Sequence, residues 1–239
     1  MMPSSGPVIG VGNAQPLSEE ARICNDVVSH LHATGVNFLA IDFDDTLIQG
    51  HTFGRWPGNA VDLAAKIRPL FRSLIPVAML NGLHVAIVTF SSQVSLIRQC
   101  LLHQFPDFGD NILIRGMDDT WEYHGDGDSE GKQKHLASVA EEINNNDLEN
   151  MRNGVSTNSN RNIFSSSGSS SSSSVVVVAQ KDSSAVSNAS KITRATTLLI
   201  DDDINNVFAA LRNKVRAILC SPQYDNPERQ LIDDLLRIE

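Results

Sequence analysis

Five short apolar runs recur along this chain, separated by longer stretches of mixed polarity. Runs of about four to eight residues that are apolar throughout are typical of strands buried in a parallel sheet. Several of these runs end abruptly in polar or charged residues, which places hydrophilic chemistry at the ends of strands. The predicted strands cover residues 38–41, 83–88, 112–115, 196–200 and 215–220.

Between the predicted strands, apolar residues recur at helical spacing. Ser18 is expected to cap the first helix and Gly35 to end it, while Pro69 and Pro76 should kink or divide the second. Strands that alternate with helices predict a parallel sheet with right-handed crossovers. We therefore expect an α/β fold, a Rossmann-like parallel sheet with helices on both faces. The predicted helices cover residues 17–34, 59–81 and 93–104 and begin again near residues 136, 207 and 228.

Two segments differ from the rest in composition. Residues 1–16 are rich in Gly and Pro and are predicted to be a flexible N-terminus. Residues 144–191 contain an asparagine run and a nearly unbroken serine run, and such a segment buries too little apolar surface to offset the entropy of ordering. We therefore expect residues 17–143 and 192–239 to form a single domain, interrupted by a disordered Asn/Ser-rich insertion at 144–191.

Composition narrows the classes of partner. The 239-residue chain is long enough for one sizeable core, and its net charge of -9 disfavours non-specific binding to nucleic acid or an anionic membrane. Its three cysteines are widely spaced and match neither a disulfide framework nor a zinc site. No apolar run reaches the roughly 18 residues of a membrane-spanning helix. We therefore expect a cytoplasmic protein with no membrane or nucleic-acid partner.

The first predicted strand ends in a group of carboxylates. Asp42 and Asp44 lie two residues apart directly after the apolar run, so both can converge at the carboxyl edge of the sheet, where α/β proteins bind ligands. Clustered carboxylates repel one another unless a positive charge lies between them. Mg2+ suits this position because it binds one or two protein carboxylates together with phosphate oxygens. The alternative is an acidic turn after a core strand.

Three further polar elements follow in order along the chain. Thr89 and Ser91 come directly after the second predicted strand, where hydroxyl groups and the N–H groups of a helix start can bind phosphate oxygens. Lys132 precedes an apolar helix, although Lys134 is an alternative for the same role and either could be an ordinary surface lysine. Asp202 follows the fourth predicted strand within a second group of carboxylates.

The segment Asp42-Phe43-Asp44-Asp45-Thr46-Leu47 resembles the first motif, DxDx(T/V)(L/V), of the haloacid dehalogenase-like (HAD) superfamily. The succession of this segment, Thr89, Lys132 and Asp202 resembles the four motifs of that superfamily in their order. The resemblance extends over roughly residues 38–220, apart from the insertion, and implies a HAD-like α/β domain. Only about 45 residues separate the first motif from Thr89, so no large cap domain is expected.

The resemblance also implies a role for each matching residue. Asp42 would be the nucleophile that forms an aspartyl-phosphate, and Asp44 would be the acid and base. Mg2+ would be held by Asp42, the backbone carbonyl of Asp44 and Asp202, with Asp201 or Asn206 beside them. Thr89 and Lys132 would take part in catalysis by neutralising and orienting the phosphoryl group. The residues implied to bind the substrate are Thr89, Ser91, Lys132 and Arg55.

These features together predict an enzyme that hydrolyses a phosphate monoester with Mg2+ as cofactor. By the same resemblance, an acid at Asp44 favours a phosphatase over a dehalogenase. The substrate would be a phosphorylated small molecule or a phosphoprotein. Two alternatives stay open: a catalytically inactive HAD-like protein whose serine-rich insertion recruits a partner, and a phosphotransferase of the same fold.

Overall fold

The computed structural model describes residues 18–123, 125, 130–152, 191–221 and 225–239. The predicted flexible N-terminus, residues 1–16, and residues 153–190 of the predicted insertion lie outside the described residues. The centre of the structure is a five-stranded, all-parallel sheet with the strand order β3-β2-β1-β4-β5. The strands are β1 (Phe38–Ile41), β2 (His84–Val88), β3 (Leu113–Arg115), β4 (Thr197–Asp201) and β5 (Arg216–Leu219).

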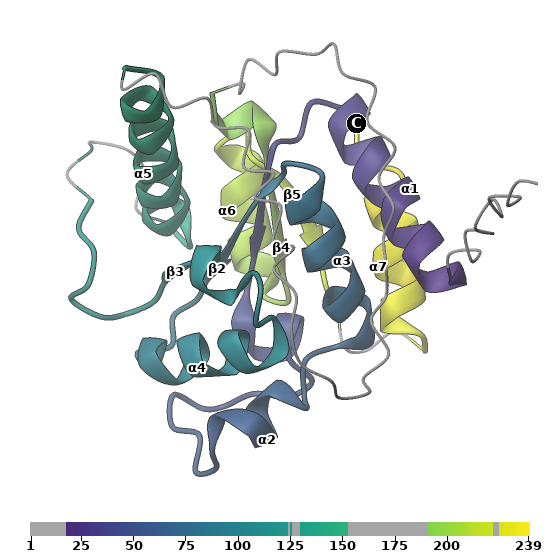
Figure 1. Cartoon of the computed structure of the whole chain (residues 1–239), viewed down its shortest axis with the longest axis vertical. Coiled ribbons are helices and arrows are strands. Elements are labelled where there is room, and N and C mark those ends of the chain that lie inside the picture. Colours follow the sequence, from purple (N-terminus) through teal and green to yellow (C-terminus); the bar gives the residue numbers. More distant parts are fainter. Residues whose placement is uncertain (1–17, 124, 126–129, 153–190, 222–224) are drawn as a thin grey trace, which may run out of the picture.

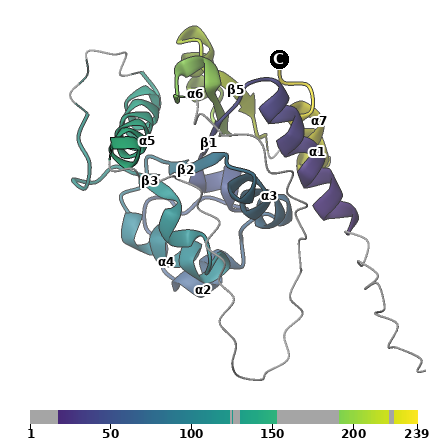
Figure 2. The same ribbon diagram turned by 45° about the horizontal axis from the view of Figure 1, so that its top comes forward.

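Helices cover both faces of this sheet, which confirms the predicted α/β, Rossmann-like fold (Figure 1). The helices are α1 (Glu19–Ala33), α2 (Ala60–Ala64), α3 (Pro69–Leu80), α4 (Val94–Gln104), α5 (Gln133–Arg152), α6 (Ile204–Arg212) and α7 (Pro227–Leu235). Buried side chains of α1, α3, α4 and α7 pack on one face, and those of α5 and α6 pack on the other. Figure 2 shows the same two layers from a second direction.

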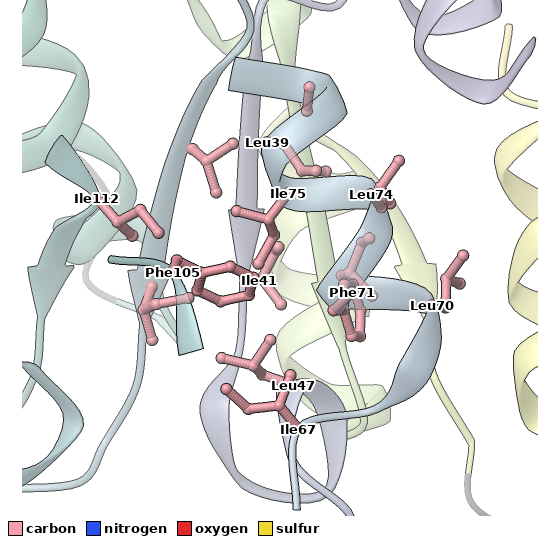
Figure 3. Close-up of a cluster of buried hydrophobic side chains, with 14 of the residues drawn as sticks. Leu39, Ile41, Leu47, Ile67, Leu70, Phe71, Leu74, Ile75, Phe105 and Ile112 are labelled. Carbon is pink, nitrogen blue, oxygen red and sulfur yellow. The ribbon is translucent and has the colours of Figure 1, made fainter. Parts of the chain in front are cut away.

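The central strand β1 is apolar throughout because both of its faces are covered. Leu39 and Ile41 belong to the core on the α3 side, whereas Phe38 and Ala40 belong to the core on the α5 and α6 side. In Figure 3, Leu39 and Ile41 face the side chains of α3, among them Phe71. Successive strand residues point to opposite faces, so a strand packed on both sides needs an unbroken apolar run.

The helix boundaries follow local chemistry. Ser18 caps α1, its Oγ accepting a hydrogen bond from the backbone N–H three residues later at 3.2 Å. Gly35 ends that helix with a φ of 81°, a left-handed conformation that glycine adopts readily. The predicted helical region 59–81 is divided as expected, because Pro69 begins α3 at a position that needs no N–H donor, while Pro76 is accommodated inside α3.

The connection between β1 and β2 contains no separate domain. Residues 42–83, all of them described, form a tight turn, a loop, α2 and α3, and α3 packs directly on the sheet. Within the described part of the chain there is accordingly no large cap, as predicted. The helices that the structure describes include none that is both long enough and apolar enough to cross a membrane.

The first residues of the predicted disordered insertion, 144–191, are helical in the structure. Helix α5 continues to Arg152, so the asparagine run is helical. Asn144 Nδ2 donates a hydrogen bond to the carbonyl of Ile192 at 3.0 Å, and the Ile192 N–H donates to Asn144 Oδ1 at 2.8 Å. Composition could not predict this helix, because its stability comes from packing of side chains such as Ile143 on the sheet.

Because Asn144 and Ile192 are hydrogen-bonded to each other, we predict that residues 153–190 between them can be removed. We expect that replacing residues 153–190 by about eight Gly and Ser residues changes the free energy of unfolding by no more than about 1 kcal/mol, since the entropy of closing a loop depends only weakly on its length. Urea unfolding of the two chains measures the difference. A loss of several kcal/mol would show that the removed residues pack on the domain.

Candidate active site

The carboxyl ends of β1, β2 and β4 lie side by side at one edge of the sheet. Ile41 pairs with Ile87 of β2 and with Ile200 of β4, so the three strands end at the same level. Strands β2 and β3 extend to one side of β1, and β4 and β5 extend to the other. Open α/β sheets bind ligands at such a switch point. The polar residues at the ends of these three strands are Asp42, Thr89 and Asp201.

A buried ammonium group links the two central strands. Lys132, which is 1% exposed, has its Nζ 2.8 Å from Asp201 Oδ2 and is also ion-paired with Asp42 Oδ1. Both carboxylates are buried. We call Asp42, Lys132 and Asp201 the ion-pair cluster. Lys134, the alternative considered from the sequence, is exposed, so it is Lys132 that lies at the carboxylates.

The carboxylates around the ion-pair cluster carry more negative charge than Lys132 neutralises. Burial raises the pKa of Asp42; Lys132 opposes this shift, while Asp201 and Asp202 add to it. Burial and the neighbouring Asp201 also raise the pKa of Asp202. Burial by itself would lower the pKa of Lys132, but Asp42 and Asp201 raise it above the ordinary value, so this residue stays an ammonium ion. A further positive charge would stabilise the ionised carboxylates.

The start of α6 orients Asp201 and leaves Asp202 more accessible. Asp201 Oδ1 accepts hydrogen bonds from the Asp203 N–H at 2.9 Å and from Asn206 Nδ2 at 3.0 Å. Asp201 is completely buried, whereas Asp202 is only half-buried and accepts a hydrogen bond from the Thr46 hydroxyl at 3.4 Å. Of these two carboxylates, Asp202 is therefore the one that a ligand can reach.

The turn Phe43–Leu47 follows the end of β1 and carries Asp44 and Asp45. Asp45 has a φ of 52°, in the left-handed region that aspartate tolerates better than most residues. The buried Arg68 donates from Nε to the Thr46 carbonyl at 2.9 Å and from Nη2 to the Asp45 carbonyl at 2.8 Å. A charged side chain thus satisfies backbone carbonyls of the turn that no helix or strand can satisfy.

The loop after this turn fixes the side chain of Asp44. The Thr52 N–H donates to Asp44 Oδ1 at 2.8 Å, and the Thr52 hydroxyl donates to Oδ2 at 2.9 Å. His51 Nδ1 lies 3.7 Å from Asp44 Oδ2 and accepts a hydrogen bond from the Phe53 N–H. Thr52 therefore determines where the Asp44 carboxylate points. Sequence patterns contain no signal for this role, because a single threonine in a glycine-containing loop belongs to no periodic pattern.

Thr89 and Ser91 lie at the end of β2, and both are buried. The Ser91 N–H donates to Thr89 Oγ1 at 3.1 Å, and the Gln93 N–H donates to Ser91 Oγ at 3.2 Å. Both hydroxyl oxygens accept in these bonds, which leaves each O–H able to donate to a ligand. Arg55 is exposed in the loop after Asp44 and lies outside the ion-pair cluster, so its contact with substrate stays a prediction.

His135 lies about one helical turn beyond Lys132 and is enclosed by aromatic rings. Its ring centroid is 5.4 Å from that of Phe90, edge-on, and 4.8 Å from that of Trp121. Burial lowers its pKa to about 4, with Lys132 and Arg115 contributing, so the imidazole is neutral at neutral pH. Neither ring nitrogen has a hydrogen-bond partner within the described ranges. The sequence did not single out His135, because a histidine on a helix face has no distinguishing pattern.

The residues at this edge fit a hard divalent cation with few protein ligands. No group of three His, Cys, Asp or Glu side chains is arranged to hold a metal ion in the part of the chain that the structure describes. The ligand set implied by the HAD resemblance needs only two carboxylates, Asp42 and Asp202, with the backbone carbonyl of Asp44. Mg2+ is usually held in this way, with water and phosphate oxygens completing its coordination. Burial is the largest cause of the raised pKa of both Asp42 and Asp202, and neighbouring carboxylates add to it.

Lys132 is predicted to stabilise the site when no metal ion is bound. Lys132→Met leaves Asp42 and Asp201 facing each other in a buried site, and we expect a loss of about 3 kcal/mol in the free energy of unfolding, since proton uptake by one carboxylate limits the cost. Urea unfolding in the presence of a chelator measures it. Lys134→Met is the matched control and should cost less than about 0.5 kcal/mol. Equal losses in the two variants would contradict this role.

His135 is predicted to make the protein sensitive to acid. Its pKa is about 4 in the folded chain and about 6.5 in an unfolded chain, so the unfolded chain binds more protons between these values and stability falls as pH falls through this window. Between about pH 7 and about pH 4.5, wild type should lose about 2–3 kcal/mol more than His135→Phe. Urea unfolding at both pH values tests this, and parallel losses in the two proteins would refute it.

Comparisons with protein-family models, with curated proteins and with solved structures find no match for this chain. The structure establishes an α/β fold with an ion-pair cluster at the switch point of its sheet. The residues of that edge, their burial and their charges are therefore the grounds for a functional inference.

Proposed function

We propose that this protein is a Mg2+-dependent phosphatase of the HAD type, which hydrolyses a phosphate monoester through an aspartyl-phosphate. The observation that carries the proposal is the convergence of Asp42, Lys132 and Asp201 at the carboxyl edge of the sheet, with Asp202 beside them. An ion pair that served stability alone would gain nothing from additional buried carboxylates, which are costly to desolvate. The succession of four HAD-like motifs in the sequence supports the same function.

In the first half-reaction, a carboxylate oxygen of Asp42 attacks the phosphorus atom and the bond from phosphorus to the leaving oxygen breaks. Asp44 gives its proton to that oxygen, so the product leaves as an alcohol. Lys132 neutralises the phosphoryl oxygens, and the hydroxyl groups of Thr89 and Ser91 donate hydrogen bonds to them. The enzyme is left as an aspartyl-phosphate on Asp42.

In the second half-reaction, Asp44 is a carboxylate and takes a proton from a water molecule whose oxygen attacks phosphorus. The bond between phosphorus and Asp42 breaks, and inorganic phosphate leaves. Thr52 orients Asp44 for this step, since its N–H and hydroxyl groups donate to the two carboxylate oxygens at 2.8 and 2.9 Å. The proton lost by Asp44 in the first half-reaction is recovered in the second.

Mg2+, when held by Asp42, Asp202 and the carbonyl of Asp44, would supply positive charge against the phosphoryl oxygens. The short connection between β1 and β2 favours hydrolysis over transfer to a second substrate, because residues 42–83 contain no separate domain that would exclude water. The same absence of a covering domain in that segment favours a phosphorylated substrate whose remaining part is bulky, such as a phosphoprotein.

We expect wild type to hydrolyse a generic aryl phosphate in the presence of Mg2+ and to lose this activity in a chelator. Asp42→Asn removes the nucleophile and should reduce kcat by about a thousandfold or more. Asp26→Asn, at an exposed aspartate of α1, is the matched control and should leave kcat unchanged. Steady-state kinetics on the three purified proteins provides the measurement.

Two results would count against this mechanism. Turnover that survives Asp42→Asn intact would exclude Asp42 as the nucleophile. Absence of turnover in wild type, with Mg2+ binding still detected by calorimetry, would favour the regulatory or binding protein.

A further inference from the structure

An aromatic ring lies directly beside the proposed phosphate site. Phe90 follows Thr89 in the chain and is 46% exposed, and the Nζ of Lys132 lies 5.4 Å from the centroid of its ring. Phe90 also contacts the imidazole of His135 edge-on, and Trp121 packs on the same imidazole. We call Phe90, Trp121 and His135 the aromatic cluster. The mechanism described above uses none of its members.

The loop after β3 holds the outer part of this cluster in place. Trp121 Nε1 donates a hydrogen bond to the carbonyl of Gly116 at 2.9 Å. The N–H of Met117 donates to the carbonyl of Ser91 at 3.0 Å, which ties this loop to the loop after β2. Met117 is itself 62% exposed. Exposed apolar side chains therefore extend from adjoining loops at the β2 and β3 side of the site.

His135 is the independent observation that points to a ligand. It is only 7% exposed, and neither of its ring nitrogens has a hydrogen-bond partner among the residues described. A neutral imidazole has one donor and one acceptor, and buried polar atoms are rarely left without a partner unless they have a function. Phe90 is half-exposed and can change rotamer rapidly, which would open the imidazole to a group bound next to Lys132.

We propose that the aromatic cluster binds the leaving group of the substrate, and that this group is an aromatic ring with a polar atom that hydrogen-bonds to His135. The inference rests on the proposed phosphatase function and specifies its substrate class as aryl phosphate monoesters. The ring of the leaving group packs on Phe90, as aromatic pairs do in protein cores. A ring joined directly to the phosphoryl oxygen suits the short separation of Lys132 and Phe90, whereas the ribose of a nucleotide would intervene.

Binding of non-hydrolysable phosphonates tests the aromatic contact without requiring turnover. By calorimetry with Mg2+ present, phenylphosphonate should bind wild type about tenfold more tightly than methylphosphonate. Phe90→Ala should abolish this preference. Phe208→Ala is the matched control, since Phe208 is an exposed phenylalanine of α6, and it should keep the preference.

The role of His135 is tested with hydroxyphenylphosphonates, which carry a polar atom on the ring. Wild type should bind at least one hydroxyl isomer about tenfold more tightly than phenylphosphonate. His135→Phe keeps an aromatic ring but has no nitrogen, and it should lose this advantage while binding phenylphosphonate within about twofold of wild type. His135→Gln, which retains a donor and an acceptor, should keep part of it.

The outcomes separate this inference from the phosphatase proposal. Hydrolysis of phenyl phosphate and ethyl phosphate, combined with equal affinity for phenylphosphonate and methylphosphonate, would overturn the aromatic site and leave the phosphatase standing. Hydrolysis of neither ester would overturn both. A hydroxyl preference that survives in His135→Phe would overturn the proposed hydrogen bond to His135. Preferential hydrolysis of adenosine 5′-monophosphate over phenyl phosphate would overturn the aryl assignment.

Discussion

The carboxyl edge of the sheet depends on the buried ammonium group of Lys132. Asp42 and Asp201 end neighbouring strands and would repel each other in a site closed to water, and Lys132 contacts both. Desolvating three charges is costly, and the cost is tolerable only when further hydrogen bonds support them. Asn206 and the Asp203 N–H provide such bonds for Asp201. With Asp202 close to Asp201 and Asp42, the carboxylates at this edge outnumber the ammonium group of Lys132.

Packing and hydrogen bonds hold the groups around the ion-pair cluster in position. Apolar residues on both faces of β1 and β4 hold the strand ends at a common level. Arg68 fixes the turn after β1 through two backbone carbonyls, and Thr52 fixes Asp44 through both carboxylate oxygens. The turn after β1 and the Asp44 carboxylate are therefore oriented by side chains that take no part in the proposed reaction, as pre-organised sites require.

The two sides of the site differ in chemistry. The β1 and β4 side presents carboxylates and an ammonium group, which suit a metal ion and a phosphoryl group. The β2 and β3 side presents Phe90, Trp121 and the neutral His135, which suit an apolar ring with one polar atom. Under the proposed function, the first side performs the chemistry that all phosphate monoesters share and the second selects among leaving groups.

The sequence alone determined the five strands, the α/β class and the strand ends that carry Asp42, Thr89 and Asp201, because burial between two helix layers requires apolar runs and polar residues must follow where they stop. Tertiary structure decided the rest. Lys132 and Asp42 are 90 residues apart, so local patterns could not distinguish Lys132 from Lys134. The pairing of Thr52 with Asp44, the enclosure of His135 and the helical asparagine run likewise depend on packing between distant segments, which periodicity and composition do not encode.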